Sequence, residues 1–137
     1  MTSARRITSI LVLAVISILP SPARSQPSQN TPAATIVLRL SNFSFTPDRL
    51  QLRVGVPVHL NFVNVSGGGH NFSAPEFFAA SLIVSGLPPK DGTIEVASEA
   101  STDLTLIPRA AGTYEFRCRH FLHSVLGMSG TILVTAQ

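Results

Sequence analysis

The sequence predicts an all-β domain arranged as an antiparallel β-sandwich. Short runs of β-branched and aliphatic residues recur along the chain, and Gly, Pro and Asn separate them. Several of these runs alternate strictly between apolar and polar residues. A period of two places alternate side chains on one face of a strand, so each run can cover a core with a single face. Many short strands separated by turn residues are typical of two packed sheets.

Seven segments carry these strand patterns. The alternation is clearest after Asp48, where Leu50, Leu52 and Val54 fall on one face before Gly55 ends the run. The strands that we expect cover residues 35–40, 49–54, 56–65, 93–96, 102–107, 113–118 and 130–135.

The stretch from Ala74 to Ser85 is ambiguous. Pro75 suits the first turn of a helix, because its missing N–H is not needed there. The residues that follow, 76–83, are apolar enough for a short helix. We therefore expect one short helix or an irregular excursion in this stretch.

Residues 1–25 have the features of an export signal. Arg5 and Arg6 precede a short apolar run, Pro20 ends that run, and small residues follow at a plausible cleavage site. The run is shorter than the about 20 apolar residues of a membrane span. A retained membrane anchor is the alternative, and the export route stays open. We expect a periplasmic mature protein with a disordered leader at 26–34, which is rich in Pro, Gln, Asn and Ser, and one domain at 35–137.

Removal of this signal changes the charge balance. The chain has 10 Lys and Arg against 7 Asp and Glu, and three of the arginines (Arg5, Arg6 and Arg24) lie in the predicted signal. The mature chain would therefore be neutral, and it has no basic run for binding phosphates. We expect no nucleic-acid partner and no membrane span in the mature form.

Scarce metal-binding side chains fall close together near the end of the chain. Cys118 is the only cysteine, so in an exported protein it cannot form an internal disulfide. His123 follows five residues later, Met128 follows after five more, and His70 stands upstream behind three glycines. Two imidazoles, one thiolate and a weak axial thioether are the ligand set of a blue-copper electron-transfer site.

Each of these residues also has an ordinary structural role. A lone cysteine is most often a small buried hydrophobe, and methionine often fills gaps in a core. In the strand at 113–118, Cys118 would share its buried face with Tyr114 and Phe116. Because His123 and Met128 follow Cys118 closely in the sequence, a metal site is a better interpretation than a purely structural role.

Other residues around the predicted site leave alternatives open. His120 competes with His123 as a ligand, but it lies so near Cys118 that trigonal angles at one ion are difficult, and we favour His123. The carbonyl of Gly69 could serve as a weak axial oxygen. Asn71 could form a hydrogen bond to the loop that carries Cys118. His59 lies within a strand, and we interpret it as structural.

These motifs resemble those of the cupredoxins, in the plastocyanin/azurin superfamily of type 1 blue copper proteins. The resemblance covers most of residues 35–135, and the Cys-x4-His-x4-Met spacing is similar to that of rusticyanin-like members. It implies a Greek-key β-sandwich that holds one type 1 copper ion at one end. It also implies that His70, Cys118 and His123 are equatorial ligands and that Met128 is axial. The ligand loop departs from the family in lacking a proline, in having Arg119 after the cysteine, and in its extra histidine, His120.

The function that follows is one-electron transfer between redox proteins through Cu(II) and Cu(I). The partner would be a redox protein, such as a cytochrome or a copper oxidoreductase, and we expect a monomer. We expect no enzymatic activity, because copper oxidases and nitrite reductases need further copper centres, for which this chain has too few histidines. The alternative is a copper-binding protein for delivery, storage or tolerance that uses the same residues in a more open loop.

Overall fold

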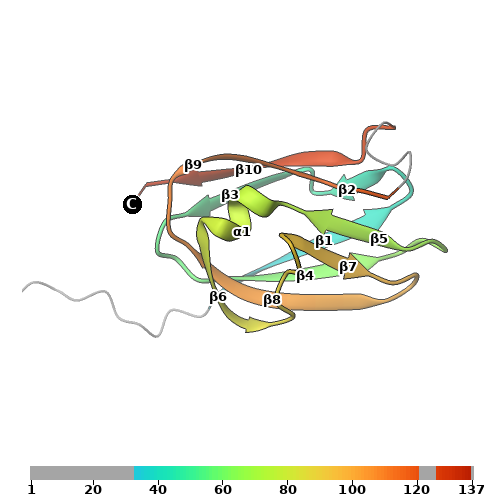
Figure 1. Cartoon of the computed structure of the whole chain (residues 1–137), viewed down its shortest axis with the longest axis horizontal. Coiled ribbons are helices and arrows are strands. Elements are labelled where there is room, and N and C mark those ends of the chain that lie inside the picture. Colours follow the sequence, from blue (N-terminus) through green and yellow to red (C-terminus); the bar gives the residue numbers. More distant parts are fainter. Residues whose placement is uncertain (1–32, 121–125, 137) are drawn as a thin grey trace, which may run out of the picture.

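The structure is a computed structural model that describes residues 33–120 and 126–136. Within these residues, ten strands form two five-stranded sheets that pack face to face (Figure 1). The predicted signal peptide and most of the predicted leader lie outside the described residues, as does His123. The single helix among the described residues has five residues, too few to span a bilayer.

The chain moves between the two sheets several times. The first sheet contains, in spatial order, β2 (Ser44–Thr46), β1 (Ala34–Ser41), β4 (Val58–Asn64), β8 (Ser101–Pro108) and β6 (Ser81–Gly86). The second contains β3 (Arg49–Arg53), β10 (Ser129–Thr135), β9 (Gly112–Arg117), β5 (His70–Ser73) and β7 (Thr93–Val96). The predicted all-β sandwich is therefore confirmed.

The sheets are not antiparallel throughout, which corrects the sequence-based expectation. β1 is parallel to β4, with Ala34 opposite Val58, and β3 is parallel to β10, with Leu50 opposite Ile132. After β1 the chain forms the short strand β2, crosses to the other sheet for β3, and returns as β4 in the original direction. Apolar alternation defines the faces of a strand but not its direction, so the sequence pattern could not reveal these parallel pairs.

The ambiguous stretch contains both a helix and a strand. α1 (Pro75–Ala79) is a single short helix with Pro75 in its first turn, as the sequence suggested. The chain then enters β6, an edge strand paired only with β8 among the described strands, and this strand was not predicted. Its apolar side chains are largely solvent-exposed, including Leu82 and Val84, so it lacks the clear two-faced burial of the strands that the pattern identified.

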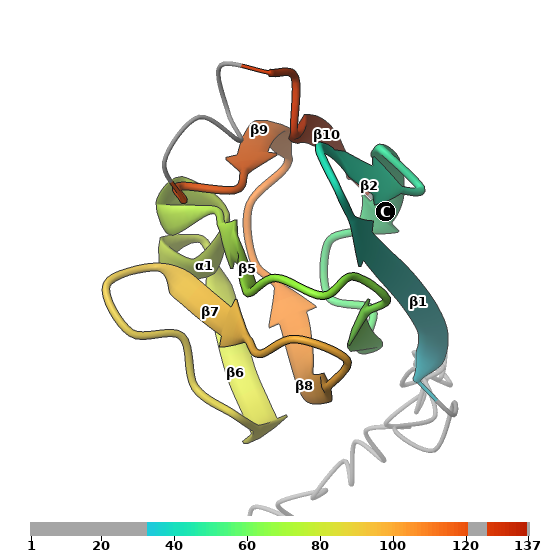
Figure 2. The ribbon, with the colours of Figure 1, turned by 90° about the vertical axis from the view of Figure 1, so that its right-hand side faces the viewer.

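The core lies between the sheets and extends to the end that carries the predicted site. The apolar faces predicted for β3 and β4 are buried, including Leu50, Leu60 and Phe62. Phe72 of β5 stacks on Phe116 of β9, with ring centroids 4.8 Å apart. Figure 2 views the sandwich from the end where β9 stops and β10 begins. These two strand ends, together with the start of β5, position the candidate site.

Candidate metal centre

Cys118 follows directly after β9 and continues its buried face. Glu115 and Arg117 are exposed, whereas Phe116 and Cys118 are fully buried, as the two-residue alternation predicted. The strand ends at Arg117, one residue earlier than expected. The backbone N–H of Cys118 donates to the carbonyl of Met128 at 3.0 Å, which ties the thiol-bearing segment to the segment that leads into β10.

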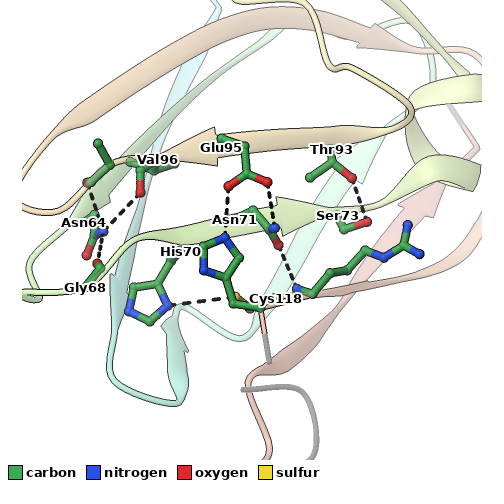
Figure 3. A network of polar contacts seen from close by, with 12 residues as sticks. Asn64, Gly68, His70, Asn71, Ser73, Thr93, Glu95, Val96 and Cys118 are labelled. Atoms are coloured by element: carbon green, nitrogen blue, oxygen red, sulfur yellow. Dashed lines mark hydrogen bonds and ion pairs between the residues drawn. The ribbon is translucent and has the colours of Figure 1, made fainter. Parts of the chain in front are cut away.

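His70 is the first residue of β5, and its side chain is fully buried. Its Nδ1 lies 3.8 Å from Sγ of Cys118, although the two residues are 48 positions apart in the sequence (Figure 3). Its other ring nitrogen, Nε2, lies 2.8 Å from Oγ of Ser66. The fold therefore brings the predicted imidazole and thiol together in a buried environment.

Met128 immediately precedes β10 and is joined to Cys118 through the main chain. Its side chain is fully buried, and its main chain pairs with that of Cys118. Gly127, immediately before it, has a φ of 94°, a left-handed conformation that a residue with a side chain rarely adopts. This glycine allows the chain to turn into β10 with Met128 directed to the interior.

The fourth predicted ligand, His123, lies in the segment 121–125 and outside the described residues, so its role stays a prediction. The rival histidine, His120, is described. Its Nε2 lies 3.0 Å from Oε2 of Glu95, a largely exposed carboxylate on β7. His120 also packs over Gly69, since its Cε1 would lie 3.4 Å from a Cβ added there.

Asn71 joins β5 to the segment after Cys118, as the sequence suggested. Its Oδ1 accepts a hydrogen bond from the backbone N–H of Arg119 at 2.7 Å, and its Nδ2 donates to Oε1 of Glu95 at 2.8 Å (Figure 3). Glu95 therefore contacts both Asn71 and His120, and sequence reasoning missed this role. The sequence contained only one indication of this role, the outward position of Glu95 in its predicted strand. Asn71 could not be identified as its partner without the register between β5 and β7, in which Asn71 faces Glu95.

His59 has the structural environment that we predicted. Its Nδ1 lies 3.1 Å from Oγ1 of Thr105, and its Nε2 lies 3.8 Å from Oδ2 of Asp103 on the neighbouring strand β8. The suggested axial role of the Gly69 carbonyl stays a prediction.

The separation of His70 and Cys118 fits a shared metal ion. A zinc-sized ion forms bonds of about 2.3 Å to a thiolate and about 2.0–2.1 Å to an imidazole nitrogen. At a trigonal angle, such bonds separate the two donor atoms by about 3.8 Å. The described residues contain no group of three or more His, Cys, Asp or Glu side chains that could hold a metal. The thioether of Met128 is not one of these side-chain types, and His123 lies outside the described residues.

Three solved structures illustrate the architectural similarity. Auracyanin B is 26% identical, with a TM-score of 0.59, over 81% of this chain and 95% of its own. A dithionite-reduced auracyanin from the photosynthetic bacterium Roseiflexus castenholzii is 20% identical, with a TM-score of 0.59, over 75% of this chain and 98% of its own. A multicopper oxidase from Campylobacter jejuni is 15% identical, with a TM-score of 0.61, over 88% of this chain but only 34% of the oxidase.

A search of curated protein sequences gave no significant match. The family profile described as "Cupredoxin-like domain" matches residues 9–134, which is most of the chain and includes His70, Cys118 and Met128. The chain therefore belongs to the cupredoxin family.

Proposed function

We propose that this chain is an exported type 1 copper protein that carries single electrons between redox proteins. The proposed ligands are His70, Cys118 and His123, with Met128 as the weak axial ligand. One observation carries the proposal: Nδ1 of His70 lies 3.8 Å from Sγ of Cys118, and both side chains are fully buried. Cupredoxins bind copper, and this thiol and imidazole have the separation expected of two ligands of one ion.

When bound, copper would supply the one-electron couple between Cu(II) and Cu(I). The protein's contribution is to hold the ligands in place and keep bulk water away. Phe72 and Phe116 are fully buried, each lies two residues from a proposed ligand in the sequence, and their stacked rings form part of a rigid apolar wall. The bonds from Asn71 to Arg119 and Glu95 restrain the segment after Cys118. A restrained ligand set changes little between oxidation states, which favours rapid electron transfer.

We further propose that electrons leave through the ring edge of His123, towards an apolar docking patch. The patch would consist of Phe121, Leu122, Val125 and Leu126, and Leu126 is 56% exposed. The partner would be a redox protein such as a cytochrome or a copper oxidoreductase. The chain itself would act as a periplasmic monomer without enzymatic activity, exported by the signal at 1–25.

The test is the visible absorption and electron paramagnetic resonance of the copper-loaded mature protein. We expect an intense thiolate-to-copper band and a narrow hyperfine splitting, and we expect Cys118→Ser to abolish the band. A weak band with ordinary tetragonal resonance parameters would contradict electron carriage and favour copper delivery or storage instead. Unchanged colour in the Cys118→Ser variant would refute the site itself.

A further inference from the structure

His70, Ser66 and Asn64 are linked by a chain of hydrogen bonds. The chain begins at Nε2 of His70, the ring nitrogen that does not face Cys118. Oγ of Ser66 lies 2.8 Å from Nε2 of His70 and 2.8 Å from Oδ1 of Asn64. Asn64 is 2% exposed and Ser66 is 7% exposed, so water contributes little to either contact. The donor and acceptor roles along this chain can be derived from its far end.

The amide orientation of Asn64 is set by three backbone carbonyls. Its Nδ2 lies 2.8 Å from the carbonyl oxygen of Gly68, 2.9 Å from that of Ala97 and 3.2 Å from that of Val96 (Figure 3). A carbonyl oxygen can only accept a hydrogen bond, so the NH₂ group must occupy this position. Oδ1 therefore faces Ser66 and accepts from its backbone N–H at 3.0 Å.

The hydroxyl of Ser66 has a single proton, and its neighbours decide where that proton points. Oδ1 of Asn64 at 2.8 Å and the carbonyl oxygen of Gly68 at 3.1 Å are both acceptors only. If the hydroxyl donated to Nε2 of His70 instead, its oxygen would face both of these acceptors with no hydrogen between them, so the hydroxyl donates towards one of the two oxygens. Its oxygen then meets His70 as an acceptor, and Nε2 of His70 is the nitrogen that carries the hydrogen.

We propose that Asn64 and Ser66 are positioning residues that select the Nε2–H tautomer of His70. In a neutral imidazole with its hydrogen on Nε2, Nδ1 carries the lone pair, and here Nδ1 faces Sγ of Cys118 at 3.8 Å. The metal-binding nitrogen is thus presented towards the thiol before any metal arrives. The part of this inference that concerns metal rests on the proposed function, whereas the tautomer assignment does not.

The sequence around these residues suits this role. Asn64 ends β4, Ser66 lies in the connection to β5, and His70 begins β5. A Cβ added at Gly67 or Gly68 would meet nothing within 4 Å, whereas the carbonyl of Gly68 accepts from Nδ2 of Asn64 and from Oγ of Ser66. Metal-ligating histidines commonly bond their second ring nitrogen to a nearby acceptor, and loss of such a partner typically lowers metal affinity about 10- to 100-fold.

The experiment is long-range ¹⁵N–¹H NMR of the metal-free mature protein, combined with copper titration against a competing chelator. We expect His70 of the unsubstituted protein to be in the Nε2–H tautomer alone. Ser66→Ala should populate both tautomers and lower copper affinity by about 10- to 100-fold, and Ser66→Thr should restore both properties. The control is Ser98→Ala, which removes a hydroxyl that donates to the Ser66 carbonyl at 3.0 Å without touching His70, and it should change neither.

Several results would overturn the inference. One is an Nδ1–H tautomer in the unsubstituted protein, a measurement that remains decisive even if Ser66→Ala does not fold. Another is a Ser66→Ala protein with unchanged tautomer and affinity, and a third is equal effects of Ser66→Ala and Ser98→Ala. If the tautomer is as expected but no copper binds, the proposed function fails and the tautomer assignment stands.

Discussion

Oδ1 of Asn71 accepts a hydrogen bond from the backbone N–H of Arg119 at 2.7 Å. This bond joins β5, the strand that begins with His70, to the segment after Cys118. The amide of Asn71 is 4% exposed, and its Nδ2 donates to Glu95 at 2.8 Å. The side chain thus requires an acceptor on one side and a donor on the other, a combination that an amide supplies and a carboxylate does not.

This arrangement makes Asn71→Asp a sharp test. The substitution keeps the acceptor for Arg119 but sets a second carboxylate against Glu95, so the free energy of unfolding of the metal-free protein should fall by about 1–3 kcal/mol. Adding Glu95→Gln should recover much of this loss, because a glutamine amide can donate to the new carboxylate and still accept from His120. Urea unfolding of both single variants and the double variant measures the coupling. Simple additivity of the two single effects would refute the contact.

The two histidines of the ligand loop should respond differently to truncation. Nε2 of His120 lies 3.0 Å from Oε2 of Glu95 on β7. His120→Ala should therefore keep the thiolate-to-copper absorption and only make the segment after Cys118 less ordered. His123→Ala should abolish that absorption, since it removes a proposed equatorial ligand. His59→Ala is the control, because that ring bonds Thr105 and lies outside the site. Loss of the band in His120→Ala with its retention in His123→Ala would reverse the ligand assignment.

The predictable part of the fold is the part that depends on local alternation. The buried faces of β3, β4 and β9 followed from the sequence, because Leu50, Phe62 and Phe116 each belong to a run in which every second residue is apolar. The parallel pairs did not follow, because strand direction depends on chain crossings between sheets. β6 was missed because an edge strand with exposed valine and leucine does not have one clean apolar face.

The candidate site likewise has a part that could be predicted from the sequence and a part that could not. Cys118 could be placed on a buried strand face from its neighbours, and its pairing with His70 was suggested by the ligand types of a blue-copper site together with the family resemblance. The hydrogen-bonding role of Asn71 was predicted, whereas those of Glu95 and Ser66 were not. These two contacts depend on which strands are neighbours and on how the connection between β4 and β5 folds back, and neither is encoded in a local pattern.

Gly130 provides a test of stability next to Phe116, whose ring forms part of the apolar wall at the proposed site. A Cβ added at this position would overlap both the ring of Phe116 and the carbonyl oxygen of Asp48. Gly130→Ala should therefore lower the free energy of unfolding by about 1–3 kcal/mol, the usual cost of overpacking a filled core. Gly67→Ala is the matched control, because an added Cβ there meets nothing within 4 Å. Urea denaturation measures both, and equal stabilities would contradict the close approach at Gly130.

Met128 separates the packing role of a buried side chain from its proposed role as an axial ligand. Met128→Leu nearly conserves volume at a fully buried position, so it should lower the free energy of unfolding of the metal-free protein by less than about 1.5 kcal/mol. The same change removes a weak axial ligand, and Cu(I) tolerates the lower coordination number better than Cu(II) does. The reduction potential should therefore rise, while the thiolate-to-copper band should remain, because the equatorial set is intact. Redox titration and absorption spectroscopy test this, and an unchanged potential in a folded, copper-loaded variant would show that Met128 only fills the core.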